Sequence, residues 1–298
     1  MARVLLITNP VAARTDPEVI RDVCRVLERR GIAVEVVETH KPGEASDLAK
    51  KGVADGVEII AVYGGDGTTM MAVRGMVGQP VILGLIPGGT GNVLAGNLRI
   101  PRSPARAAEL LAKGTPRAID LGRVERPDGV HYFAVNCGAG FDAELMAATS
   151  EKDKRRWGVG AYVATAWQRL SAVTSVPHKI VVDGQTLETR AAIVLVANCG
   201  ELVPPLVRLK EDIAPDDGLL DVVVLRADGM ADSVGVFWHL LSGTADGDKR
   251  IEYARRRRVS IETMPARPVQ LDGEPAGVTP LVAEVVPGAI RVLVPPAD

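Results

Sequence analysis

The 298-residue chain has the composition of an ordinary globular protein, with 24% charged residues, 47% hydrophobic residues and a formal net charge of -2. This balance disfavours intrinsic disorder and a coiled coil, and the length fits about two domains. Aromatic residues make up only 3% of the chain, so we expect no stacking surface for single-stranded nucleic acid.

The cysteines and the apolar runs bear on the compartment. Cys24, Cys137 and Cys199 are widely spaced and form no CxxC pair, which disfavours a disulfide framework and a zinc site and favours a reducing, cytoplasmic compartment. The apolar run at residues 4–7 is too short for a signal peptide, and no later run approaches the roughly 18 apolar residues of a membrane span. We therefore expect any contact with a membrane to be made from its surface.

The first part of the chain alternates apolar runs, typical of buried strands, with helical patterns. The predicted helices cover residues 17–30, 44–51, 70–77 and 103–113, and the predicted strands cover residues 4–7, 34–37, 57–62 and 81–86. Repeated strand–helix units predict a mainly parallel α/β sheet covered by helices. Ligands of such sheets bind beyond the carboxyl ends of the strands.

The pattern changes after the helix at 103–113. Asp-Gly pairs at 128–129 and 183–184 are typical of hairpin turns, and they indicate a second half that is mainly antiparallel β. Further strands are expected at 222–225, 259–261 and 281–286, and helices at 157–170 and 230–241. We place the domain boundary after residue 119, which predicts domains at 1–119 and 120–298. Whether a last strand at 290–294 returns to the first domain is left open.

Two glycine-rich loops follow neighbouring strands of the first domain. They are residues 63–69, Tyr-Gly-Gly-Asp-Gly-Thr-Thr, and residues 86–92, Ile-Pro-Gly-Gly-Thr-Gly-Asn. Glycines let backbone N–H groups approach phosphate oxygens, and the start of a following helix favours negative charge. A tight turn capped by Asp66 or Thr68 explains the first loop equally well on its own. Neither loop completes a G-x-G-x-x-G or a Walker A motif, but the pair predicts a phosphate-binding site.

Two carboxylates flank a glycine near the end of the chain, in Asp272-Gly273-Glu274. Such a pair can hold Mg²⁺ or accept a hydroxyl proton while a phosphoryl group transfers in line. An ordinary Asp-Gly hairpin turn explains the same residues more simply when they are taken alone. The choice depends on the motifs around them.

The motifs stand in an order that resembles the diacylglycerol kinase catalytic-domain family, which includes bacterial soluble lipid kinases and the sphingosine and ceramide kinases. The motifs occupy residues 9–10 (Asn-Pro), 64–68, 87–92, 214–221 (Ala-Pro-Asp-Asp-Gly-Leu-Leu-Asp) and 272–274. The resemblance implies an ATP- and Mg²⁺-dependent kinase that phosphorylates a lipid hydroxyl, with diacylglycerol or a similar lipid as acceptor. It also implies a cleft between a Rossmann-like α/β nucleotide-binding domain and a β-sandwich domain.

The resemblance further implies roles for single residues. It makes Asp272 the general base for the lipid hydroxyl and Asp120 its assistant, and it makes the loop with Asp217 and Leu219 the site of a structural Mg²⁺. The residues that it places around the nucleotide are Asn9, Gly65, Asp66, Gly67, Thr68, Thr90, Gly91, Asn92 and Glu274. Many bacterial relatives carry an acid and an arginine after the equivalent of Asn92 that this chain lacks, which leaves the identity of the lipid open.

NAD kinase is the nearest alternative, because it shares a GGDG loop and a related two-domain plan. It would phosphorylate a soluble ribose hydroxyl instead of a lipid. The loop at 87–92, the turn at 272–274 and the segment at 136–142 favour the lipid acceptor.

A catalytically silent nucleotide- or lipid-binding regulator is an alternative from another class. The intact carboxylates of Asp66, Asp272 and Glu274 argue against it, because a protein that only binds needs no base beside the acceptor. Sequence alone leaves this alternative open, since geometry decides catalysis.

Two basic clusters bear on partners. Residues 152–156 beside Trp157 are typical either of a membrane-surface contact or of a solvated helix start, whereas Arg255–Arg258 is better explained as a solvated or salt-bridged edge. We expect a cytoplasmic protein that meets its lipid substrate at the inner membrane surface and binds no nucleic acid. A homodimer is left open.

Overall fold

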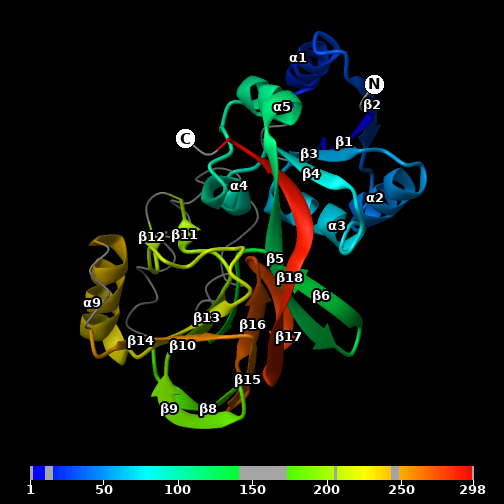
Figure 1. Cartoon of the computed structure of the whole chain (residues 1–298). Helices are drawn as coiled ribbons and strands as arrows, with labels where there is room; N and C mark the ends of the chain where they lie inside the picture. Colours follow the sequence, from blue (N-terminus) through cyan, green and yellow to red (C-terminus); the bar gives the residue numbers. More distant parts are fainter. Residues whose placement is uncertain (1–2, 11–15, 141–172, 205–206, 243–247, 297–298) are drawn as a thin grey trace. The chain divides into compact units, whose positions relative to one another are not determined.

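The computed structural model describes residues 3–10, 16–140, 173–204, 207–242 and 248–296 (Figure 1). The predicted helix at 157–170 and the basic cluster at 152–156 lie outside these residues. The chain divides into two compact units, which we call the first unit (residues 1–119 and 288–298) and the second unit (residues 120–287).

The first unit is built on a parallel sheet in the order β2-β1-β3-β4-β18, in which the last part of β18 pairs with β4 through Arg291 and Ile82. Helix α1 packs on α5, and α2 packs on α3. The predicted parallel α/β architecture is confirmed. The elements are β1 (Arg3–Thr8), α1 (Pro17–Glu28), β2 (Ala33–Glu38), α2 (Glu44–Ala54), β3 (Ile59–Gly64), α3 (Asp66–Arg74), β4 (Ile82–Pro87), α4 (Val93–Asn97) and α5 (Pro104–Lys113).

Local sequence explains where these elements begin. The Asp16 carboxylate accepts a hydrogen bond from the Glu18 N–H at 2.8 Å, and Pro17 occupies the first turn of α1, so both start signals are used. Strand β3 is buried along its whole length, which fits its uninterrupted apolar sequence and its central place in the sheet. Some boundaries differ from the prediction: α3 begins at Asp66 instead of residue 70, and α2 ends at Ala54 instead of residue 51.

The second unit is a β-sandwich. One sheet has the order β14-β13-β10-β7-β16-β17 with antiparallel pairs throughout, and β6, β5, β18, β15, β8 and β9 form the other layer. The predicted antiparallel sandwich is confirmed. The elements are β5 (Thr115–Arg126), β6 (Gly129–Phe133), β7 (Asn136–Gly140), β8 (Val176–Val182), β9 (Gln185–Ala191), β10 (Ile193–Ala197), β11 (Glu201–Val203), β12 (Val207–Arg208), β13 (Leu220–Leu225), α9 (Gly229–Ser242), β14 (Ile251–Arg256), β15 (Arg258–Thr263), β16 (Pro268–Leu271), β17 (Glu274–Val278) and β18 (Leu281–Val294).

Residues from both layers of the sandwich share one apolar core, which includes Phe133, Cys137, Val222 and Ile261. The sequence predicted two separate strands at 281–286 and 290–294, but β18 is continuous. Gly288 has a φ of +57°, a conformation that glycine adopts readily, so the strand bends there without ending.

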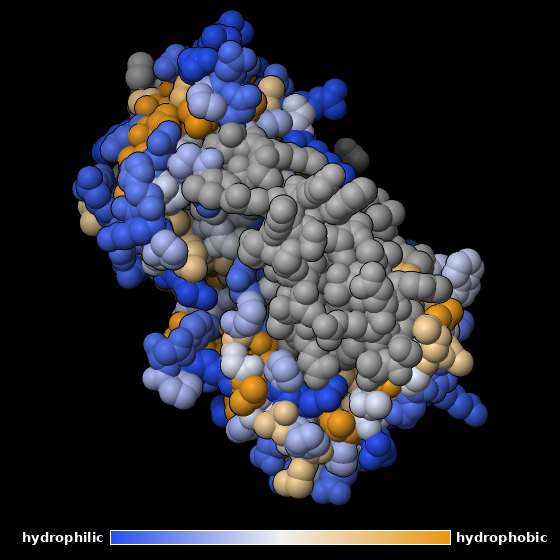
Figure 2. All heavy atoms as spheres, turned by 180° about the vertical axis from the view of Figure 1, so that it is seen from behind, coloured by the Kyte–Doolittle hydropathy of each residue, from blue (hydrophilic) through white to orange (hydrophobic). Residues whose placement is uncertain are grey.

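One face of the molecule shows mostly polar side chains among the described residues (Figure 2). On the face shown in Figure 2, hydrophilic residues predominate among those that carry colour, and hydrophobic ones form small groups. Within the described part of the chain, no helix is long and apolar enough to cross a membrane.

Candidate functional site

The two glycine-rich loops of the first unit lie against each other at the ends of β3 and β4. These strands pair in parallel with Gly64 opposite Pro87, and the Gly88 N–H donates to the Gly64 carbonyl at 2.9 Å. A Cβ on Gly89 would lie 2.6 Å from the Gly65 Cα, a distance that real Cβ atoms do not show. The close approach of the two backbones therefore requires glycine at position 89.

The end of β1 joins the same group of loops. The Asn9 side-chain amide donates to the Thr68 hydroxyl at 2.9 Å, and the Asn9 backbone N–H donates to the Tyr63 carbonyl at 3.3 Å. The structure thus brings together the Asn-Pro turn and the first glycine loop, which are far apart in sequence. This grouping follows from the topology, because β1 pairs with β3.

Asn92 closes the second loop on itself. Its backbone is left-handed, with a φ of +50°, and its side chain accepts from the Gly89 N–H at 3.0 Å and donates to the Gly89 carbonyl at 2.7 Å. Thr90 and Gly91 lie between these two residues and are exposed. The loop therefore presents its middle residues to solvent while Asn92 fixes its ends.

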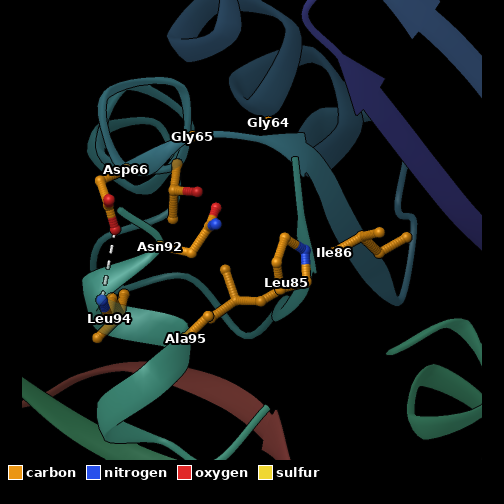
Figure 3. A pocket seen from close by; sticks show the side chains of 10 residues that line it. Gly64, Gly65, Asp66, Leu85, Ile86, Asn92, Leu94 and Ala95 are labelled. Atoms are coloured by element: carbon orange, nitrogen blue, oxygen red, sulfur yellow. Dashed lines mark hydrogen bonds between the residues drawn. The ribbon is translucent and has the colours of Figure 1, made fainter. Parts of the chain in front are cut away.

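Asp66 connects the two loops at a small pocket (Figure 3). Its carboxylate accepts from the Leu94 N–H at 3.4 Å, at the start of α4, and it lines the pocket together with Gly65, Asn92 and Ala95. Burial raises the pKa of the Asp66 carboxyl, and hydrogen bonds from the backbone of residues 92–94 act in the opposite direction. Asp66 therefore holds the second loop as well as standing at the first turn of α3.

The first turn of α3 has the chemistry of an anion site. Gly65 is its N-cap residue, and among the described residues no side chain caps this end of the helix. The first N–H groups of a helix have no partner within the helix, and they carry the positive end of its dipole. Together with the exposed Gly67, Thr90 and Gly91, these N–H groups suit phosphate oxygens.

In the second unit, Asp272 lies in a tight turn between β16 and β17. Asp272 and Gly273 have φ values of +48° and +86°, as in a type I′ hairpin turn, so the hairpin interpretation is confirmed. The carboxylate is nevertheless in a specific environment. Its Oδ2 accepts from the Ala134 N–H at 2.7 Å, and its Oδ1 accepts from the N–H groups of Val135 and Asn136 at 2.8 and 3.0 Å.

The structure brings Asp120 into the same network. Asp120 is 3% exposed, and its carboxylate accepts from the Gly218 N–H at 2.7 Å. The Asn198 side-chain amide donates to the carbonyls of Asp120 and Ala134, at 2.9 Å in each case. Asp272 and Asp120 are therefore joined through Asn198 and the 134–136 segment, whereas Glu274 is exposed at the start of β17.

The loop predicted to hold a structural Mg²⁺ forms a local turn. The exposed Asp217 carboxylate accepts from the Leu219 N–H at 2.9 Å, and the Gly218 N–H between them is used by Asp120. Over the described ranges, no group of three or more His, Cys, Asp or Glu side chains could hold a metal ion. These residues thus do not assemble a metal centre of their own, and the role of Asp217 and Leu219 stays a prediction.

Asn198, Ala134 and Val135 are functional candidates that the motifs did not single out. A weak signal existed, since Asn-Cys-Gly occurs at both 136–138 and 198–200. Strands β7 and β10 are antiparallel and pair Asn136 with Ala197, so the two tripeptides meet at one end of the sheet. The repeated tripeptide therefore indicates one end of this sheet, although the two copies do not form a structural repeat.

The basic run Arg255–Arg258 is largely salt-bridged. Arg255 pairs with Asp221 at 3.2 Å and with Asp212 at 2.8 Å, and further ion pairs join Arg256 to Asp183 and Arg258 to Glu284. The interpretation of this run as a salt-bridged edge is confirmed for these three arginines.

Parallel strands that end in paired glycine loops, together with a β-sandwich that holds a fixed carboxylate turn, define a protein of the α/β class with a second β-sandwich unit. Residues 3–124 match the family model of the diacylglycerol kinase catalytic domain, and residues 135–294 match that of the YegS C-terminal NAD kinase beta sandwich-like domain. The chain belongs to the diacylglycerol kinase family of YegS-like lipid kinases.

Individual relatives agree with this assignment. The chain is 27% identical to a diacylglycerol kinase of Mycobacterium tuberculosis, over 99% of this chain and 96% of the relative. It is 29% identical to a diacylglycerol kinase of Bacillus subtilis, over 94% and 92% of the two chains. A crystal structure of a diacylglycerol kinase from Bacillus anthracis has a TM-score of 0.77 over 99% of this chain and 97% of its own, at 23% identity, and shows the same fold.

Proposed function

We propose that the protein transfers the γ-phosphate of ATP to the hydroxyl of a lipid, with diacylglycerol or a similar lipid as acceptor. Family membership supports a phosphotransferase, and the names of the relatives support the lipid acceptor. The single observation that carries the proposal is the backbone contact between Gly65 and Gly89 beside the uncapped start of α3, because it supplies phosphate-sized donors from two loops.

In the proposed mechanism the first unit binds and orients the nucleotide. Backbone N–H groups of the loops at 65–68 and 89–92 hold its phosphates, and Asn9 and Asn92 fix the shape of the loops. Bound Mg²⁺ would supply charge neutralisation to these phosphates, and the exposed Glu274 carboxylate would be available to hold it.

The second unit supplies the base in this proposal. Asp272 accepts the proton of the lipid hydroxyl as the hydroxyl oxygen bonds to the γ-phosphorus and the bond from that phosphorus to the β,γ-bridging oxygen breaks. The N–H groups of residues 134–136 hold the Asp272 carboxylate in place, and Asp120 supports the same network. We place the reaction at the inner surface of the cytoplasmic membrane, where the lipid is found.

The test is transfer of radiolabelled γ-phosphate from ATP, with and without Mg²⁺, to a mixed lipid extract and, in a parallel reaction, to NAD. We expect a labelled lipid that requires Mg²⁺, and its identification names the acceptor. Label in NADP alone would favour the NAD kinase alternative. No label in either reaction, from a protein that binds ATP, would favour the silent regulator.

A further inference from the structure

Asn198 occupies the junction of three segments of the second unit. It follows β10 directly and is fully buried. Its side-chain amide donates to the Asp120 carbonyl in β5 and to the Ala134 carbonyl between β6 and β7, at 2.9 Å in both cases. One side chain thus ties the strand that carries Asp120 to the segment that holds Asp272.

Asn198 and Asp272 bind the same two peptide groups, Asn198 through their carbonyl oxygens and Asp272 through their N–H groups. The Ala134 carbonyl, which accepts from the Asn198 side chain, shares its peptide group with the Val135 N–H that donates to Asp272. The Val135 carbonyl accepts from the Asn198 backbone N–H at 2.8 Å, and it shares its peptide group with the Asn136 N–H, the second donor to Asp272 Oδ1. Hydrogen bonds in such a chain polarise one another, so each donation from Asn198 strengthens a donation to Asp272.

The remaining atom of the amide distinguishes Asn198 from an ordinary structural residue. Asn198 Oδ1 is buried and has no hydrogen-bond partner among the described residues. A side chain that served packing alone would gain more from an apolar residue of similar size, since an unpaired buried acceptor is unfavourable. The two donations from Nδ2 are therefore the contribution for which an amide is needed here.

We propose that Asn198 is a positioning residue for phosphoryl transfer, which fixes Asp272 through the 134–136 peptides and holds Asp120 beside the same segment. The inference rests on the proposed lipid kinase function and extends it. In this proposal Asn198 acts through Asp272 and does not contact the substrate. Its loss is expected to lower the rate of the chemical step while the nucleotide site of the first unit keeps its affinity.

The test compares Asn198→Ala and Asn198→Ser with a matched control, Cys199→Ala, in the full-length protein. Cys199 is equally buried and its thiol also donates to the Ala134 carbonyl, at 3.3 Å, whereas the Asn198 amide donates to both the Ala134 and the Asp120 carbonyls. For each variant, kcat and the KM values for ATP and lipid are measured, together with ATP affinity and thermal stability.

We expect Asn198→Ala to lose roughly 10- to 100-fold in kcat, as for other residues that orient reactive groups, with ATP affinity and the KM for ATP unchanged. Asn198→Ser retains one donor and should be intermediate, and it replaces the alanine variant if that variant does not fold. Folded Asn198 variants with wild-type kcat would overturn the inference alone, as would an equal loss in Cys199→Ala. A wild-type protein that phosphorylates no lipid would overturn the proposed function and this inference with it.

Discussion

The two glycine-rich loops of the first unit, which we call the phosphate loops after their proposed role, and the turn at Asp272 and Gly273 of the second unit are built in opposite ways. The loops depend on missing side chains, because Gly65 and Gly89 let two backbones meet. The turn depends on a side chain that is present, because the Asp272 carboxylate gathers the N–H groups of residues 134–136. Added atoms should therefore damage the first site, and removed charge should damage the second.

The largest effect should come from Asp272→Asn. Asparagine tolerates the left-handed backbone at this position, where φ is +48°, so the turn should survive. The proton acceptor is lost, and one oxygen that accepts from the N–H groups of residues 134–136 becomes an NH₂ donor. Removal of a general base typically lowers the rate by roughly 10²- to 10⁴-fold. We expect kcat for lipid phosphorylation to fall within this range.

ATP affinity is the control for this variant, since the phosphate loops belong to the other unit. Calorimetric titration of ATP should give the wild-type Kd for Asp272→Asn. A fully active Asp272→Asn enzyme would remove the residue from the role of base and would break the comparison.

A second, smaller effect should come from Gly89→Ala. The new Cβ would lie 2.6 Å from the Gly65 Cα, and backbone atoms cannot move aside as a flexible side chain can. The loops must separate, and we expect ATP affinity to fall by about 10-fold or more, equivalent to ~1.4 kcal/mol.

Gly52→Ala is the matched control for added volume. Its Cβ would also make a close contact, 2.7 Å, but with a methyl group of the flexible Leu5 side chain, and its next neighbours are Ile60 and Val57, not residues of the loops. ATP affinity should stay at the wild-type value in this variant. An equal loss in both variants would mean that general destabilisation, not loop separation, explains the effect.

The features that the sequence could predict are those that depend on local residue patterns. Strands, glycine loops and the Asp272 turn are set by local residue patterns, and the structure confirms the parallel and antiparallel architectures that these patterns indicate. The sequence pattern places the start of α3 four residues late, because the glycines at 65 and 67 are typical of a loop. In the structure, Gly65 is the N-cap of α3 and Gly67 lies in its first turn.

The network around Asp272 could not be predicted in this way. The contacts of Asn198 with Asp120 and Ala134 span 78 and 64 residues of sequence, and no local periodicity reports such hydrogen bonds. They become visible only when the pairing of β7 with β10 is known. The role of each predicted site residue in binding or catalysis stays a prediction, because that role depends on contacts with a bound substrate.

Asn9→Ala should have a moderate effect on the phosphate loops, and it tests whether a side chain also matters there. The change removes the hydrogen bond to the Thr68 hydroxyl, and a single neutral hydrogen bond contributes about 0.5–1.5 kcal/mol. ATP affinity should therefore fall by roughly 2- to 10-fold. Thr39→Val is a matched control for the loss of one hydroxyl hydrogen bond in the first unit, because the Thr39 hydroxyl donates to the Thr8 carbonyl at 3.3 Å and not to Thr68. A loss as large as that of Gly89→Ala would contradict the proposed dependence on backbone contact.

The smallest effect concerns Asp248, a carboxylate of the second unit that is held mainly by a guanidinium, with one further hydrogen bond from the Arg250 backbone N–H to its Oδ1 at 2.9 Å. Arg250 donates to both oxygens of Asp248, at 3.0 and 2.7 Å, and these hydrogen bonds lower the pKa of Asp248 from 3.8 to about 2. A lowered pKa stabilises the folded protein above the unfolded value and loses this stabilisation as the pH falls from about 4 to about 2.

Asp248→Asn should therefore reduce the free energy of unfolding by about 1 kcal/mol at pH 5, after allowance for solvent screening, and the difference from wild type should vanish near pH 2. Urea titrations of both proteins at several pH values measure this difference. Because the Asp248 carboxylate is bound by Arg250 and His239, which do not belong to the Asp272 network, kcat at neutral pH should not change. A constant difference in stability across this pH range would show that the ion pair does not cause it. A lower kcat would show that Asp248 and Asp272 are coupled. The second unit would then not separate a carboxylate that stabilises the fold, Asp248, from the proposed base, Asp272.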